Sequence, residues 1–137
     1  ANFMNINHDQ KLSLLNQLIR IASADGEHRD EEYDMLHLVA KQLDVDPMEM
    51  EMLFTKDHEF SPPVSEAKRT SIFYYLLLMI WVDGELHNDE VLLLKEFSTH
   101  LGLSTQAVQS VLNESRLYPN GNIPISHIVK TFQVHHN

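Results

Sequence analysis

The chain has 137 residues, of which 43% are hydrophobic and 22% are charged, and its ten basic and twenty acidic residues give a net charge of −10. This length and composition predict a single domain, residues 1–137, with a sizeable core, and the negative charge argues against binding to nucleic acid or anionic lipid. Because the chain contains no cysteine, disulfide scaffolds, thiol catalysis, zinc–thiolate sites and iron–sulfur clusters are excluded.

The sequence contains no segment typical of targeting or membrane insertion. Its N-terminus is polar and lacks the basic-then-apolar order of a signal peptide. The longest apolar run covers residues 72–82, whereas a membrane span needs about 20 apolar residues. We therefore expect no direct membrane insertion, a central buried helix in place of a span, and a cytoplasmic location.

Apolar residues recur three and four positions apart along most of the chain, which predicts an all-α fold of about seven helices. The third helix has the clearest start, with Asp46 as N-cap, Pro47 at the first helical position and Glu49 completing a capping box. An Asn120-Gly121 turn separates the last two helices. In chain order, the expected helices cover about 9–24, 30–43, a segment after Asp46, 65–82, 88–101, a segment after Ser104, and 124–134.

An internal repeat is the most informative feature of the sequence. A shift of 58 residues places Asp25-Gly26-Glu27 on Asp83-Gly84-Glu85 and Glu32 on Glu90. Each unit is predicted to be helix, Asp-Gly-Glu turn, helix, short loop and helix, over about 9–55 and 65–113, followed by a C-terminal helix. A pseudo-twofold arrangement of the two units would bring the two acidic turns close together.

Each acidic turn combines three residues with different physical roles. The glycine lies just past a helix end, where a left-handed backbone is expected. The aspartate, Asp25 or Asp83, opposes the helix dipole at a cost of about 0.3–1 kcal/mol, so its removal should slightly stabilise the metal-free fold. The later glutamate, Glu32 or Glu90, lies in the first turn of the next helix. A capping role would explain that glutamate alone, but not the aspartate or the recurrence of the whole set.

The spacing from Asp25 to Glu32 matches only half of an EF-hand loop. With Gly26 at the sixth position, the first and third positions are apolar or lack a carboxylate in both copies, so a standard EF-hand is rejected. Two half-loops that face one another would form one oxygen-rich site suited to a hard divalent cation such as Ca²⁺ or Mg²⁺. The predicted ligands are Asp25, Glu32, Asp83 and Glu90, with Glu27 and Glu85 around them.

These residues carry a resemblance to the tellurite-resistance TerB-like family, over about residues 9–132. The resemblance implies an all-α domain of about seven helices with a pseudo-symmetric acidic cluster, and an association with bacterial resistance to tellurite and other stresses. At family level, both metal binding and scaffolding have been proposed, and related domains occur fused to membrane-linked chaperone and phage-defence components. Family members often have Ser-Pro at the start of the second helix, where this chain has Arg29-Asp30 and His87-Asn88. The matching residues are Ala24-Asp25-Gly26-Glu27, Asp30-Glu31-Glu32, Leu36 and Leu43, and then Val82-Asp83-Gly84-Glu85, Asp89-Glu90, Leu94 and Leu101.

Other kinds of site find less support in the sequence. His28 and His87 flank the acidic turns and could join a metal shell, although a shift of 58 residues places His28 on Leu86. Neither a nucleophile elbow nor a phosphate-binding glycine-rich loop is present. We therefore expect a non-enzymatic acidic module with a basic or membrane-associated protein partner, acting in a stress-resistance assembly. A divalent-cation sensor is the alternative, and a small metal-dependent hydrolase is the least favoured function.

Overall fold

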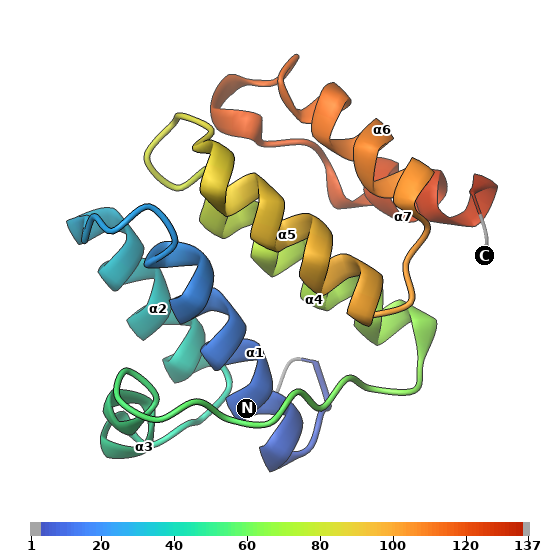
Figure 1. Ribbon diagram of the computed structural model, residues 1–137. Coiled ribbons are helices and arrows are strands. Elements are labelled where there is room, and N and C mark those ends of the chain that lie inside the picture. The colour runs from blue at the N-terminus through green and yellow to red at the C-terminus, as the bar shows by residue number, and fades with distance from the viewer. Residues whose placement is uncertain (1–3, 136–137) are drawn as a thin grey trace.

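The computed structural model describes residues 4–135, and the regular secondary structure in this part of the chain is all helical, with no strand. Seven α-helices and one short 3₁₀ helix follow one another (Figure 1). The all-α prediction is therefore confirmed. The elements are α1 (His8–Ala22), α2 (Asp30–Gln42), α3 (Pro47–Met52), α4 (Glu66–Ile80), α5 (Asn88–His100), α6 (Thr105–Ser115), η1 (Pro119–Gly121) and α7 (Ile125–Val134).

The helix starts follow the 58-residue offset found in the sequence. Helix α1 begins at residue 8 and α4 at 66, α2 at 30 and α5 at 88, and α3 at 47 and α6 at 105. Each pair is thus offset by 58 residues. A twofold superposition of the two units stays a prediction.

Helix α4 is the centre of the core and packs against α1, α5 and α7. Its residues are apolar on nearly every side, which is typical of a helix enclosed by others. Phe73, Leu76, Met79 and Ile80 are fully buried, and Leu78 is partly exposed. The predicted central position of this helix is confirmed. Among the described residues, no helix is both long enough and apolar enough to cross a lipid bilayer.

The helix caps agree with the sequence pattern at most starts and differ at one. The side chains of Ser65 and Ser104 accept hydrogen bonds from backbone N–H groups of their own helices, and Asp46 accepts one from Met48. Glu49 does not complete the predicted capping box. Its carboxylate instead contacts His8 Nε2 at 2.7 Å, because α3 lies beside the start of α1.

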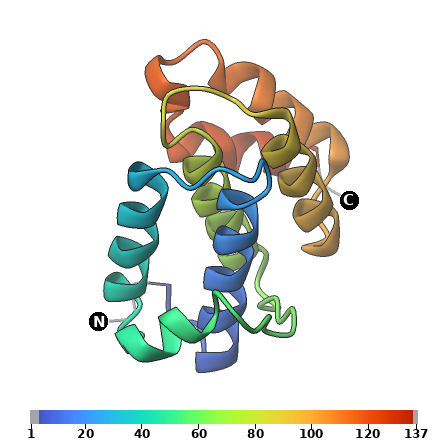
Figure 2. The same ribbon diagram turned by 60° about the vertical axis from the view of Figure 1, so that its left-hand side comes forward.

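The loops α1–α2 and α4–α5, which carry the two acidic turns, lie side by side at one end of the molecule. They are adjacent in both views of the ribbon (Figures 1 and 2). Arg29 of the first loop also forms an ion pair with Asp83 of the second. The packing of α1 on α4 and of α4 on α5 therefore joins two segments that are far apart in the sequence.

Candidate metal centre

The two acidic turns have the same local geometry. Asp25 Oδ1 accepts a hydrogen bond from Glu27 N at 3.1 Å, and Asp83 Oδ1 accepts one from Glu85 N at the same distance. The intervening glycines have φ of +78° and +85°, as predicted. Each aspartate therefore fixes its turn with one carboxylate oxygen and leaves the other, Oδ2, for a second partner.

The aspartates lie farther from the helix ends than the sequence indicated. Helix α1 ends at Ala22 with Ser23 as C-cap, and α4 ends at Ile80. Asp25 and Asp83 thus lie three residues past the last helical residue, where the dipole effect has largely fallen off. The expectation that both carboxylates oppose a helix dipole is wrong, because the helices stop before the turns begin.

Arg29 lies at the centre of the cluster and joins the two turns. Its Nη2 contacts Asp25 Oδ2 at 2.8 Å and its Nε contacts Asp83 Oδ2 at 3.1 Å. Its Nη1 lies farther from the glutamates, at 3.5 Å from Glu32 Oε2 and 3.6 Å from Glu90 Oε2. All four predicted ligand side chains therefore converge on one guanidinium, whose charge offsets part of theirs.

His87 occupies the position in the second turn that matches Arg29 in the first. Its Nε2 contacts Asp83 Oδ2 at 2.8 Å, and its Nδ1 lies 3.7 Å from Asp25 Oδ2. The hydrogen bond to Asp83 raises the pKa of His87, an effect that burial opposes. Each turn therefore supplies a basic side chain four residues after its aspartate, and both basic side chains reach across to the other turn.

The two glutamates occupy matching positions but have different partners. Glu32 is 3% exposed, and its Oε1 accepts a hydrogen bond from Arg29 N at 3.2 Å. Glu90 is 1% exposed, and its Oε2 is buried with no hydrogen-bond partner. Buried polar atoms are nearly always paired. This Glu90 oxygen lies 3.6 Å from Arg29 Nη1, beyond hydrogen-bond distance, and is therefore a candidate ligand for a group bound at this cluster.

Burial and charge separate the acidic groups into two kinds. The hydrogen bond from Arg29 lowers the pKa of Asp25. At Asp83, burial alone would raise the pKa. Hydrogen bonds from His87 and Glu85 N, together with the nearby positive charges, outweigh burial and lower the pKa of Asp83. Burial raises the pKa of Glu32, and burial together with the charge of Glu32 raises the pKa of Glu90 to about 8. The cluster thus favours the ionised form of the two aspartates and the protonated form of Glu90.

Three side chains are close enough to share one cation. Ligand atoms of Asp25, His87 and Glu90 all lie within 4.8 Å of one another. Two carboxylates and one imidazole form a mixed oxygen and nitrogen donor set, whereas the predicted Ca²⁺ or Mg²⁺ site had oxygen ligands alone. The carboxylates suit Mn²⁺ as well as Mg²⁺ and Ca²⁺, and the imidazole favours a transition-metal ion over those two. These three side chains therefore offer suitable ligand atoms for a divalent cation. Such a cation would compete with the Arg29 guanidinium for the carboxylate of Asp25.

The supporting residues predicted beside the cluster differ from one another. Glu27 Oε2 contacts Arg29 Nη2 at 2.9 Å and belongs to the cluster, although its side chain is 70% exposed. The exposed Glu85 carboxylate makes no hydrogen bond or ion pair within residues 4–135, and neither does the exposed His28 ring. Glu85 and His28 are therefore not brought into the site, because both side chains point to solvent.

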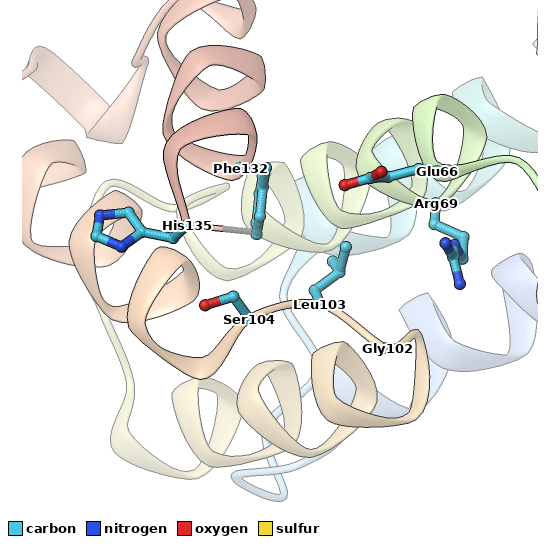
Figure 3. A pocket seen from close by; sticks show the side chains of 7 residues that line it. All are labelled: Glu66, Arg69, Gly102, Leu103, Ser104, Phe132 and His135. Atoms are coloured by element: carbon cyan, nitrogen blue, oxygen red, sulfur yellow. The ribbon is translucent and has the colours of Figure 1, made fainter. Parts of the chain in front are cut away.

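The cavity shown in Figure 3 lies away from these carboxylates. It has a volume of about 100 Å³ and is lined by Glu66 and Arg69 at the start of α4, by the α5–α6 connection and by the end of α7. The acidic turns lie at the opposite end of α4. This cavity is also too small for most substrates, since ligand pockets typically measure about 300–1,000 Å³.

Comparison with known proteins bears on the first half of this site. Residues 2–54 match the family model described as tellurite resistance protein TerB. Over this segment the chain is TerB-like. No curated protein and no solved structure gives a significant match. The resemblance stated from the sequence is thereby confirmed for the segment that holds the first acidic turn.

The TerB match includes Asp25, Arg29 and Glu32 and ends before Asp83 and Glu90. The second half of the cluster is therefore known from the 58-residue offset and the geometry, and not from the family match. Arg29, which lies at the centre, was not among the predicted site residues. A usable signal was present, because the same offset places Arg29 on His87 and so repeats a basic residue four positions after each aspartate.

Proposed function

We propose that this chain is a non-enzymatic, TerB-like helical module whose two acidic turns together bind one divalent cation. The observation that carries the proposal is the carboxylate of Glu90, which is 1% exposed and has an oxygen without a hydrogen-bond partner. Asp25 and His87 lie within reach of the same point. A cation there would satisfy the buried oxygen and remove the need for Glu90 to hold a proton.

Arg29 gives the module a defined cation-free state. Its guanidinium contacts both aspartates, so the turns are held together before a cation arrives. A divalent cation at Asp25, His87 and Glu90 would compete with this guanidinium for Asp25 Oδ2. We infer that the cation displaces Arg29 from Asp25 and changes the charge of the surface beside the turns. A cation would stabilise the site by neutralising the acidic side chains, and no bond-making chemistry is assigned to it.

The wider role that fits this behaviour is a cation-responsive protein contact in a bacterial stress-resistance assembly. The family match supports the connection to tellurite resistance, since TerB is described by that phenotype. The first turn and α2 add exposed carboxylates at Glu27, Glu31 and Asp34, next to the Arg29 that would move. We therefore expect a basic or membrane-associated protein partner to bind this surface in response to the change in its charge.

Thermal melting with and without divalent cations tests the proposal. We expect Mn²⁺ to raise the melting temperature of the wild-type chain, and Ca²⁺ and Mg²⁺ to raise it less. Ligand binding to the folded state stabilises by about 2.7 kcal/mol at a hundredfold excess over Kd. Glu90→Gln should strongly reduce the Mn²⁺ shift. Arg29→Gln should lower stability in chelator but enlarge the Mn²⁺ shift, because it removes the competing guanidinium.

Glu85→Gln is the matched control, since it makes the same charge change in the exposed part of the second turn. We expect it to keep the wild-type Mn²⁺ shift. A shift that is equal in wild type, Glu85→Gln and Glu90→Gln would contradict a site at Glu90. The absence of any shift with all three cations in the wild type would contradict cation binding altogether, and would leave Arg29 as the permanent structural cation of the cluster.

A further inference from the structure

Helix α1 has a polar stripe that faces the interior. Ser13, Asn16 and Gln17 are 3–4% exposed and lie three and four positions apart, so they share one face of the helix. A helix that covers a core normally buries its apolar residues. These three side chains instead line a cavity of about 180 Å³ whose other walls come from α5 and from the connection between α3 and α4. Figure 1 shows this connection crossing the start of α1.

Two members of the stripe have partners in the α3–α4 connection. Ser13 Oγ accepts a hydrogen bond from Ser61 N at 3.0 Å, and Asn16 Nδ2 donates to Asp57 Oδ1 at 3.4 Å. These contacts hold the connection over the cavity. Gln17 differs, because its Nε2 is buried and donates to no acceptor. Gln17 therefore lines the cavity and carries an amide donor that is shielded from water and lacks an acceptor.

Arg20 continues the same stripe one turn later and lines the same cavity. Its guanidinium carbon lies 5.1 Å from the centre of the Phe97 ring, a stacking contact that fixes the direction of the side chain. Within the described part of the chain, Arg20 forms no ion pair, although the chain has twenty acidic residues. Its charged donors therefore remain available, beside Gln17, for an acceptor from outside.

The remaining walls are aromatic. Phe97 lies under Arg20, and the Phe60 and His100 rings lie 5.9 Å apart at the other side. Flat apolar walls next to an amide and a guanidinium favour a ligand that has a planar acceptor at one end and an apolar body at the other. Glu96 also lines the cavity and repels any anion there, so Arg20 can balance one negative charge on a ligand more readily than two.

We propose that this cavity binds a small monocarboxylate, with its carboxylate at Gln17 Nε2 and the Arg20 guanidinium and its apolar body against Phe60 and Phe97. A guanidinium pairs with a carboxylate through two parallel hydrogen bonds, and the unpaired amide of Gln17 supplies a third donor. The volume of about 180 Å³ lies below the range for drug-sized ligands, about 300–1,000 Å³, so the ligand is a small acid. This site is separate from the acidic turns and does not depend on a cation there.

Titration of the ¹⁵N-labelled full chain with acetate, benzoate, benzyl alcohol and inorganic phosphate tests the proposal by NMR. We expect benzoate to give saturable shifts of the Gln17 side-chain amide and the Arg20 Nε–H signal, and acetate to give the same shifts with weaker binding. Benzyl alcohol has a similar ring but no charge and should not saturate these signals. Phosphate should bind more weakly than benzoate, because Glu96 repels its second charge.

Two variants distinguish this site from nonspecific attraction of anions. Arg20→Gln should weaken benzoate binding about tenfold or more, the usual effect of losing a charge-assisted hydrogen bond. Arg116→Gln makes the same charge change at an exposed position and should leave the affinity unchanged. The proposal is overturned if neither carboxylate shifts the Gln17 amide through the millimolar range, which would mean that water fills the cavity. It is also overturned if the two variants weaken binding equally, or if phosphate binds more tightly than benzoate.

Discussion

Glu90→Gln should change how the stability of the metal-free protein depends on pH. Glu90 is 1% exposed, and burial together with the charge of Glu32 raises its pKa to about 8. In the unfolded chain, a glutamate ionises near pH 4.3. Between these values the folded state holds a proton that the unfolded state has lost, so raising the pH favours unfolding. Glutamine keeps the shape of the protonated side chain and cannot ionise, so it removes this contribution.

The size of the effect follows from the slope of the linkage relation. One proton bound only by the folded state corresponds to about 1.4 kcal/mol per pH unit. Between pH 5 and pH 7 the wild type should therefore lose up to about 2.7 kcal/mol of unfolding free energy relative to Glu90→Gln. His87 contributes with the same sign, because its raised pKa gives stability that is present below its unfolded value, about pH 6.5, and is lost as the pH rises through the folded value. That contribution remains in the variant.

Urea denaturation in chelator at several values between pH 5 and pH 7 measures the difference directly. We expect the stability of the wild type to fall more steeply with rising pH than that of Glu90→Gln. The exposed Glu85→Gln should follow the wild type. If Glu90→Gln and the wild type show parallel pH profiles, Glu90 ionises normally in the folded protein, and the account of a buried, unpaired carboxylate is refuted.

Three further changes test the turns and the core. The double variant Asp25→Asn with Asp83→Asn should lower the stability of the metal-free fold at pH 7 by about 1–3 kcal/mol for each lost charged hydrogen bond, as measured by urea denaturation. A rise in stability would instead support an unfavourable interaction of the aspartates with the helix dipoles. Gly26→Val should lose more than about 1 kcal/mol at its φ of +78°, with Gly26→Asn losing less; equal losses would argue against backbone strain. Phe73→Ala, in the centre of the core, should lose about 3–5 kcal/mol in urea denaturation, while Val64→Ala, at a position that is 93% exposed, should change little, and similar losses would contradict the assigned core.

The fold could be predicted from the sequence because local signals agree with the tertiary packing. The apolar run of residues 72–82 becomes the central helix α4, and the caps Asp46 and Ser104 begin α3 and α6 where expected. At Glu49 the prediction was wrong because a long-range contact decided the outcome. Glu49 has the right spacing for a capping box but contacts His8 on another helix, and spacing within one helix cannot indicate such a contact.

The candidate site was predictable in its residues and less so in its chemistry. The repeat brought Asp25, Glu32, Asp83 and Glu90 to attention, and all four contact Arg29. Because Glu32 and Glu90 occupy matching positions in the repeat, the sequence predicts the same role for both. Only the tertiary structure shows that Glu32 accepts a backbone hydrogen bond, whereas Glu90 has a buried oxygen without one. The acidic residues alone do not indicate Arg29, whereas the basic residue repeated at positions 29 and 87 does.

The most direct test of the account is whether the two acidic turns bind one cation together. Mn²⁺ is paramagnetic and broadens the NMR signals of nearby nuclei, and Gly26 and Gly84 provide one backbone amide signal in each turn. Titration of the ¹⁵N-labelled chain with Mn²⁺ should broaden both amides with the same midpoint, and Glu90→Gln should move both midpoints together to higher Mn²⁺ concentration. Broadening at only one turn, two distinct midpoints, or an unchanged titration in Glu90→Gln would contradict a single shared site.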